Sequence, residues 1–177
     1  MKTPAPTARL FFALWPDAAA RDELFRIGQE LRRSCGGRAT RRDNLHMTLV
    51  FLGDVARGKI PALEEVAAAQ RLPAFSIGFG AVRYWRHNRI VWVAPHTVPP
   101  PLSDFVAVLE GALEDAGFDF DRRPYVPHAT LLRNARPPAA TPAFAFDWPV
   151  RDFALVEAAR DERGVAYQTL ACWDVAA

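Results

Sequence analysis

The sequence predicts an α+β protein built from two pseudo-symmetric lobes, each an antiparallel sheet with helices on its outer face, around a central cleft. Three observations lead to this fold class. The chain has 177 residues, half of them apolar, which suits one compact domain or two small lobes that share a core. Short apolar strands alternate with amphipathic helical segments. One order of elements also occurs twice. We therefore expect a single domain, residues 1–177, made of two duplicated lobes.

The first half is expected to open with a buried strand over residues 9–14, an apolar run that ends before a proline. Asp17 is the expected N-cap of a helix that ends at two glycines, Gly36 and Gly37. A second helix should carry Pro61 in its first turn, where a missing N–H costs little. The remaining strands expected in this half lie at 45–52, 75–79, 82–86 and 89–94.

The second half is expected to begin with a helix entered through Ser103 and Asp104, after a turn of three prolines, and ended by Gly117. Four strands should follow, at 125–133, 144–148, 153–160 and 165–173, and the last two flank a hairpin turn at 161–164. In both halves a helix, a glycine stop, a loop with paired arginines and a histidine-containing strand come in the same order. Residues 75–83 also resemble residues 144–151, which suggests an ancient duplication.

Composition excludes several classes of protein. The net charge of +2 does not fit a strongly basic protein that coats duplex nucleic acid, although arginine supplies 20 of the 22 cationic residues. We find no secretory signal in residues 1–6 and no apolar run long enough for a membrane helix. The two cysteines, Cys35 and Cys172, are expected to be reduced thiols. We expect a cytoplasmic monomer without membrane contact.

The motif His-x-Thr-Leu occurs twice, at His46 and Thr48 and again at His128 and Thr130. Side chains at i and i+2 of a strand point the same way, so each motif presents an imidazole and a hydroxyl on one face. Histidine titrates near neutrality, which lets one ring act as a base while the other acts as an acid. Threonine hydroxyls can donate to the oxygens of a phosphoryl transition state. The other interpretation, two hydrogen-bonded core histidines, explains one motif better than it explains two.

Metal binding is the competing functional interpretation of the two motifs. A metal site on a strand would need His-x-His or nearby carboxylates, and neither stands beside the motifs. His-Glu-x-x-His and Cys-x-x-Cys are also absent from the sequence. We therefore expect no metal and no cofactor, and an activity that a chelator leaves unchanged.

These motifs and their flanks resemble the two-histidine (2H) phosphoesterases, and within them the bacterial and archaeal RNA 2',3'-cyclic phosphodiesterases once named 2'-5' RNA ligases. The resemblance covers nearly the whole chain and is carried by the segments at 9–14, 44–53, 125–133, 155–157 and 167–173. It implies the 2H phosphoesterase fold and a role in RNA processing. It also implies hydrolysis of RNA 2',3'-cyclic phosphate ends to 2'-phosphate ends without a metal.

In the mechanism that the resemblance implies, His128 is the proton acceptor and His46 the proton donor, and the pH–rate profile is bell-shaped. Thr48 and Thr130 would bind the phosphate oxygens. The family's motif carries an arginine at the place of Arg133, which is taken as a third phosphate contact.

Three further residues are candidates for contact with RNA. Arg42 and Arg123 lie just upstream of the two motifs and could bind phosphates, with solvated loop charges as the other interpretation. Tyr125 could stack on a base or lie in the core. For Trp85 we favour the core.

Three other functions stay open. The same chemistry could act on a small cyclic nucleotide or an ADP-ribose cyclic phosphate, or run in reverse as a 2'-5' RNA ligase. A protein of another class, a nucleotide-binding module without turnover, could use the same histidines and threonines. The expected partners are RNA ends or nucleotides with a 2',3'-cyclic phosphate.

Overall fold

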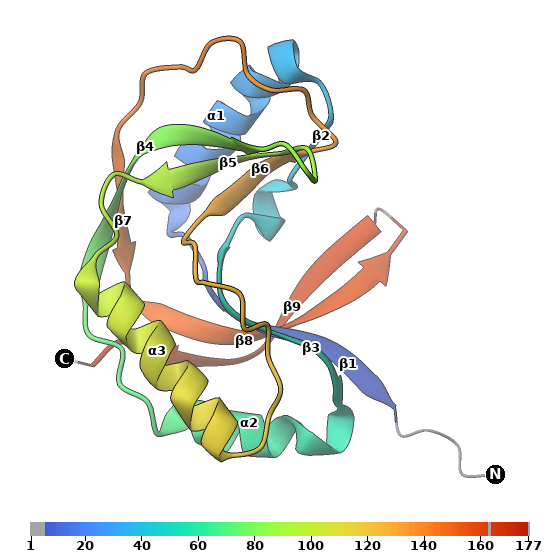
Figure 1. The fold of residues 1–177 in the computed structure, drawn as a ribbon, viewed down its shortest axis with the longest axis vertical. Coiled ribbons are helices and arrows are strands. Elements are labelled where there is room, and N and C mark those ends of the chain that lie inside the picture. The colour runs from blue at the N-terminus through green and yellow to red at the C-terminus, as the bar shows by residue number, and fades with distance from the viewer. Residues whose placement is uncertain (1–5, 163, 177) are drawn as a thin grey trace.

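A computed structural model describes residues 6–162 and 164–176 (Figure 1). The helices are α1 (Ala18–Cys35), α2 (Ile60–Ala68) and α3 (Pro100–Asp115), with single turns of 3-10 helix at η1 (Arg42–Asn44) and η2 (Arg57–Lys59). The strands are β1 (Thr7–Leu14), β2 (Arg38–Ala39), β3 (Met47–Ala56), β4 (Phe75–Trp85), β5 (Ile90–Pro95), β6 (Ala129–Arg133), β7 (Phe146–Val150), β8 (Asp152–Asp161) and β9 (Gly164–Asp174). No helix in the described ranges is both long and apolar enough to cross a lipid bilayer.

The strands form a curled antiparallel sheet in the order β7-β4-β5-β6-β3-β1-β8-β9, with β2 beside β6. At the centre, β3 and β6 share a single registered pair, Met47 with Ala129. The sheet therefore divides there into two lobes of four main strands each, which Figure 1 shows above and below the centre. This arrangement confirms the expected α+β class with two lobes.

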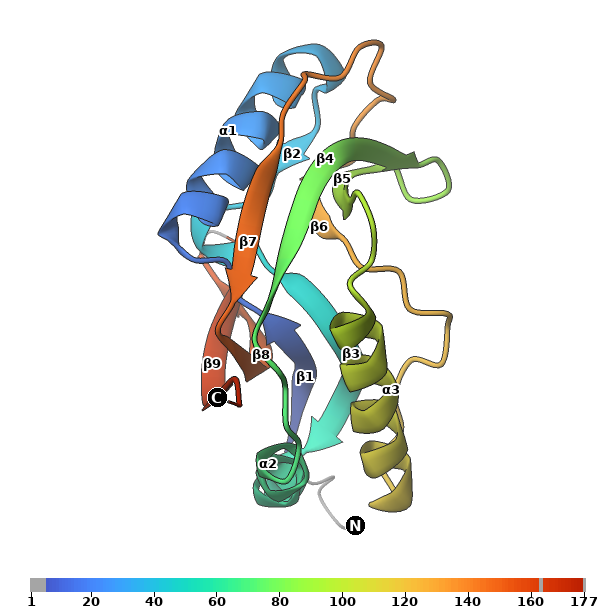
Figure 2. The same ribbon diagram turned by 90° about the vertical axis from the view of Figure 1, so that its left-hand side faces the viewer.

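Helices lie on the outer side of each lobe. Helix α1 packs against β6 and β7, whereas α3 contacts β3 and α2 contacts β9 (Figure 2). A helix from early in the chain thus covers β6, the strand that follows His128. Helix α3, from later in the chain, contacts β3, the strand that follows His46. Neither lobe is one continuous half of the sequence, because the two halves exchange segments: each lobe contains elements from both.

This exchange corrects the expected correspondence between residues 75–83 and 144–151. The two segments do not occupy equivalent places, because β4 and β7 pair with each other in one lobe, Phe75 opposite Val150 and Phe79 opposite Phe146. The expected strands at 75–79 and 82–86 are also a single strand, β4. A register shift between Phe79 and Ala81 lets this strand continue through the break in its alternation.

Several element boundaries differ from expectation for local reasons. The expected strand at 125–133 joins the ladder only from Ala129, because Pro124 and Pro127 have no N–H to donate. Helix α3 begins at Pro100 rather than near Ser103, since proline is tolerated in a first helical turn. The expected N-cap is confirmed, with the Asp17 carboxylate accepting a bond from the Ala20 N–H. Residue 163 of the expected hairpin turn, and residues 1–5, lie outside the described ranges.

The core has two parts. A large cluster of buried apolar side chains fills both lobes and includes Met47, Leu49, Ala129 and Leu131. A small second cluster, centred on Phe11, lies on the opposite face of the sheet and continues into Trp15 and Tyr167 at its edge. One side of each motif strand is therefore buried in the main core. The other side is available to form a site.

Candidate active site

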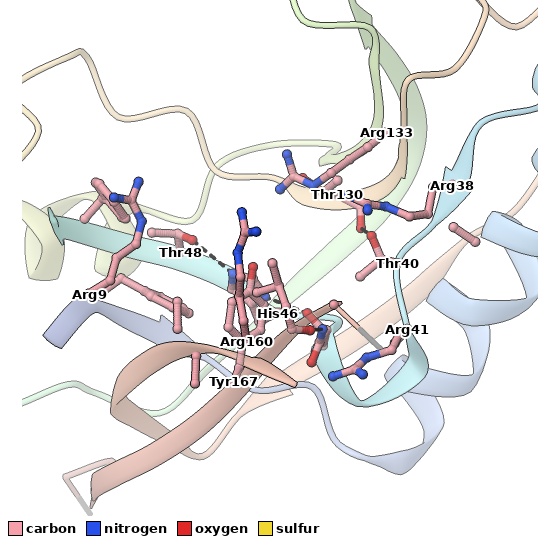
Figure 3. A pocket seen from close by; sticks show the side chains of 18 of the residues that line it. Arg9, Arg38, Thr40, Arg41, His46, Thr48, Thr130, Arg133, Arg160 and Tyr167 are labelled. Carbon is pink, nitrogen blue, oxygen red and sulfur yellow. Dashed lines mark hydrogen bonds between the residues drawn. The ribbon is translucent and has the colours of Figure 1, made fainter. Parts of the chain in front are cut away.

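A cavity of about 520 Å³ lies where the two lobes meet (Figure 3). Both motif histidines and both motif threonines line it, together with Arg133. Each histidine stands immediately before its strand, and the residues that follow them, Met47 and Ala129, are the central pair of the sheet. The sequence expectation that both motifs face one cavity agrees with this placement.

His46 is half-buried and held by bonds at both ring nitrogens. Its Nδ1 lies 2.7 Å from the Asn44 carbonyl oxygen, which can only accept, so Nδ1 carries the hydrogen. In the neutral ring Nε2 then bears the lone pair, and it lies 3.1 Å from the Thr48 hydroxyl oxygen (Figure 3).

Three aromatic rings surround His46: Phe11, Trp15 and Tyr167, with centroids 5.1, 5.7 and 4.9 Å from the imidazole. Burial lowers the pKa of His46 from 6.5 to about 4, although the bond to the Asn44 carbonyl opposes the change. The substrate-free protein therefore keeps this ring neutral at pH 7.

His128 repeats part of this arrangement. Its Nδ1 donates to the Val126 carbonyl over 2.7 Å, and its ring packs edge-on against Trp85 and Trp92, at 4.6 and 5.7 Å. Burial lowers the pKa of His128 as well. Within the described residues, Nε2 of this ring has no hydrogen-bond partner. Trp85, which we expected in the core, is half-buried and forms part of the wall behind the second histidine.

The short strand β2 and Thr40, which follows it, hold the second motif in place. The Thr40 hydroxyl donates to the carbonyl of Thr130 over 2.9 Å, and its N–H donates to the Leu131 carbonyl over 2.8 Å. In the ladder between β2 and β6, Arg38 lies opposite Arg133. The exposed side chain of Arg133 lines the cavity. Arg133, which the resemblance implies to be a phosphate contact, therefore lies in the same cavity as the two histidines.

Sequence reasoning missed four further arginines of the cavity: Arg9, Arg38, Arg41 and Arg160. Arg41 forms an ion pair with Asp161, and Arg9 lies 3.9 Å from Asp54. Arg38 and Arg160 have no carboxylate partner in the described part of the chain. Arg38 and Arg41 stand with Arg42 in the arginine-containing loop that precedes the first motif. The cluster is visible in the sequence, but the sequence does not indicate which of these arginines face the cavity.

The three candidate RNA contacts do not line the cavity. Arg42 is turned by η1 toward α1, where it pairs with Asp22. Arg123 pairs with Asp121, two residues away. Tyr125 packs against the main core, and burial raises the pKa of its hydroxyl. The structure therefore gives these three side chains no contact with a phosphate held between the histidines.

The remaining cavity residues do not resemble a metal centre. No group of three histidine, cysteine or carboxylate side chains among the described residues could hold a metal ion. The site instead combines two imidazoles, the two motif hydroxyls and an excess of guanidinium groups, which is a set suited to an anionic ester.

Comparison with known proteins agrees with this chemistry. The chain is 31% identical to the RNA 2',3'-cyclic phosphodiesterase of Escherichia coli (strain K12), over 93% of this chain and 95% of that protein. It is 28% identical to the protein of the same name from Thermus thermophilus, over 92% of this chain and 87% of that one. The crystal structure of E. coli LigT complexed with 3'-AMP superposes with a TM-score of 0.87 at 30% identity, covering 96% of this chain and 99% of that one. A family model described as the 2'-5' RNA ligase superfamily matches residues 15–162, and the chain belongs to this superfamily.

Proposed function

We propose that the protein is a phosphoric diester hydrolase that opens 2',3'-cyclic phosphates at RNA ends and leaves 2'-phosphates. The observation that carries this proposal is the pair of imidazoles in one cavity, each with Nδ1 bound to a backbone carbonyl. Such a ring can exchange a proton with a substrate only through Nε2. Two rings held in this way can take a proton from one oxygen and give a proton to another.

In the proposed reaction, Nε2 of His128 takes a proton from water while the water oxygen attacks phosphorus. The bond from phosphorus to the 3' oxygen breaks, and Nε2–H of the His46 imidazolium protonates that oxygen. One P–O bond forms and one breaks, and the product is a 2'-phosphate with a free 3' hydroxyl. Because the cyclic ester is strained, positioning and proton transfer supply most of what the reaction needs.

The remaining groups act on the phosphate oxygens. Thr48 and Thr130 have hydroxyls on the cavity face, and Arg133 offers a guanidinium that can bind two oxygens at once. Negative charge that develops on the non-bridging oxygens would be stabilised by these donors.

The assignment of acid and base is part of the proposal, and two observations bear on it. The free Nε2 of His128 can accept a proton at once, which favours His128 as the base. Burial lowers the pKa of His46 to about 4, so the proton of this ring must come with substrate binding, because the anionic phosphate favours the imidazolium. Binding of the substrate should therefore be accompanied by proton uptake.

The names of the curated relatives favour RNA as the substrate, and the cavity's arginines suit a chain with more than one phosphate. Hydrolysis of small cyclic nucleotides, 2'-5' ligation, and nucleotide binding without turnover are the alternatives. We further propose that residues 1–177 act as one domain of two duplicated lobes, as a cytoplasmic monomer without metal or cofactor.

The test is incubation with an oligoribonucleotide that ends in a 2',3'-cyclic phosphate, followed by chemical identification of the product end. We expect a 2'-phosphate, a bell-shaped pH–rate profile and no effect of a chelator. Mononucleotide 2',3'-cyclic phosphates, tested in parallel, measure the preference for RNA. Undiminished rates in the His46→Ala and His128→Ala variants would overturn the mechanism, and binding without product would favour the binding module.

A further inference from the structure

Asn44 is the one buried polar residue among those the structure describes, with 8% of its surface exposed. It lies in η1, two residues before His46, and lines the same cavity. Burying an amide is unfavourable unless its polar atoms are bonded, so a buried asparagine beside a reacting group calls for an explanation.

The main chain of Asn44 sets the tautomer of His46. Its carbonyl oxygen accepts from Nδ1 over 2.7 Å, which leaves Nε2 as the atom that faces the cavity. A rotation of this peptide plane would release Nδ1 and let the ring take the other tautomer, in which Nε2 of the neutral ring has no lone pair.

The side chain of Asn44 holds that peptide plane from a distant part of the chain. The side-chain Nδ2 donates to the carbonyl of Val165 over 2.8 Å, across 121 residues. The N–H of the same peptide plane, that of Leu45, makes a longer bond, to the Arg42 carbonyl over 3.4 Å. Val165 belongs to β9, the same strand whose Tyr167 packs against the His46 ring. One amide thus links the imidazole to the strand that forms its wall.

The second histidine reaches the same geometry differently. The carbonyl that accepts from His128 belongs to Val126, which precedes the buried Pro127. A proline restricts both its own φ and the conformation of the residue before it. The equivalent place before His46 holds Leu45, which gives no such restriction. At the first motif, hydrogen bonds take the place of the proline: the bond of the Leu45 N–H to the Arg42 carbonyl and the shorter bond of the Asn44 side chain to β9.

We propose that Asn44 is a positioning residue for His46, whose side-chain bond to β9 holds the backbone carbonyl that fixes the imidazole tautomer. This inference rests on the proposed function for its kinetic consequences. Its structural part concerns the ring alone and can be tested without substrate.

The experiment compares Asn44→Ala, Asn44→Asp and a control, Tyr84→Phe. The aspartate variant keeps the shape of the side chain but offers the Val165 carbonyl no donor, which preserves the test if the alanine variant fails to fold. The control removes a comparable bond, from the Tyr84 hydroxyl to the Ala135 carbonyl over 3.0 Å, outside the cavity. Nitrogen-15 NMR of the histidine rings reports their tautomers, and steady-state kinetics on the cyclic-phosphate oligonucleotide separate kcat from KM.

We expect both Asn44 variants to lose the single Nδ1–H tautomer of His46, to keep that of His128, and to lower kcat by roughly 10- to 100-fold with little change in KM. The Tyr84→Phe protein should retain the tautomer and the kcat. A His46 ring that stays wholly Nδ1-protonated in the Asn44 variants, or an equal loss of kcat in the control, would overturn the inference. If the unaltered protein does not hydrolyse the oligonucleotide, the proposed function fails, but the NMR result still decides the role of Asn44.

Discussion

Replacing His46 with glutamine should remove a loss of stability that the imidazole causes in mild acid. Burial against Phe11, Trp15 and Tyr167 lowers the pKa of His46 to about 4, whereas histidine in an unfolded chain titrates near 6.5. Between these values the unfolded chain binds a proton that the folded protein does not bind. This group therefore leaves the free energy of unfolding unchanged well above pH 6.5 and lowers it progressively as the pH falls toward 4.

The two pKa values set the size of the effect. At pH 7.5 the ring is neutral in both states, and its linked free energy is close to zero. At pH 5 the unfolded ring is almost fully protonated, while about nine-tenths of the folded rings are neutral. The linked loss of stability between pH 7.5 and pH 5 comes to about 2 kcal/mol.

Urea unfolding at pH 7.5 and pH 5 measures this difference. With an m-value of about 2 kcal/mol/M, the midpoint of the unaltered protein should fall about 1 M further than that of the His46→Gln variant. Other groups with shifted pKa values, such as Asp152 and Glu110, are present in both proteins and cancel in the comparison. Equal pH dependence in the two proteins would refute the idea that the fold keeps His46 neutral.

Three further predictions concern catalysis and the frame of the site. Thr48→Val should lower kcat by about 100-fold, because a donor to the developing charge is lost, and kinetics on the cyclic-phosphate oligonucleotide check this. On a p-nitrophenyl phosphodiester, whose leaving group needs no proton, His46→Ala should lose at least about 10-fold less activity than His128→Ala; the reverse order would exchange the acid and base. Gly37 has a φ of 77°, and a Cβ there would lie 2.6 Å from the Arg133 carbonyl oxygen. Gly37→Ala should therefore cost about 2 kcal/mol of unfolding free energy in urea titrations, whereas Gly111→Ala, in open space on α3, should not be destabilising.

The parts of the site that the sequence could predict are those that depend on local periodicity. Alternation along a strand was sufficient to put His46 and Thr48 on one side and Met47 in the core, because that relation holds for any extended chain. The N-cap at Asp17 is equally local. Repetition of the motif also indicated that the two histidines would share a cleft.

The parts that the sequence could not predict depend on which strands become neighbours. The pairing of β4 with β7 is decided by the tertiary fold. The local similarity of the two segments suggests instead that they occupy equivalent places in the two lobes. The choice among Arg38, Arg41 and Arg42 depends on the pairing of β2 with β6, which holds Arg38 at the cavity, and on the 3-10 turn that begins at Arg42 and directs this residue to Asp22. No periodic pattern describes such a turn.

The aromatic surroundings explain how two like motifs could take unlike roles. Both rings have the same tautomer. A difference between them in proton transfer must therefore come from the surroundings of Nε2. His46 has Thr48 at Nε2 and three aromatic rings about it, whereas Nε2 of His128 is without a partner in the described structure. A ring that water reaches with difficulty gains its proton only when an anion is present, and it then has a strong tendency to release that proton to a nearby alkoxide. An open Nε2 lone pair is suited to take a proton from water. The different surroundings of Nε2 in two equal motifs would therefore suit the proposed roles, with His46 as the acid and His128 as the base.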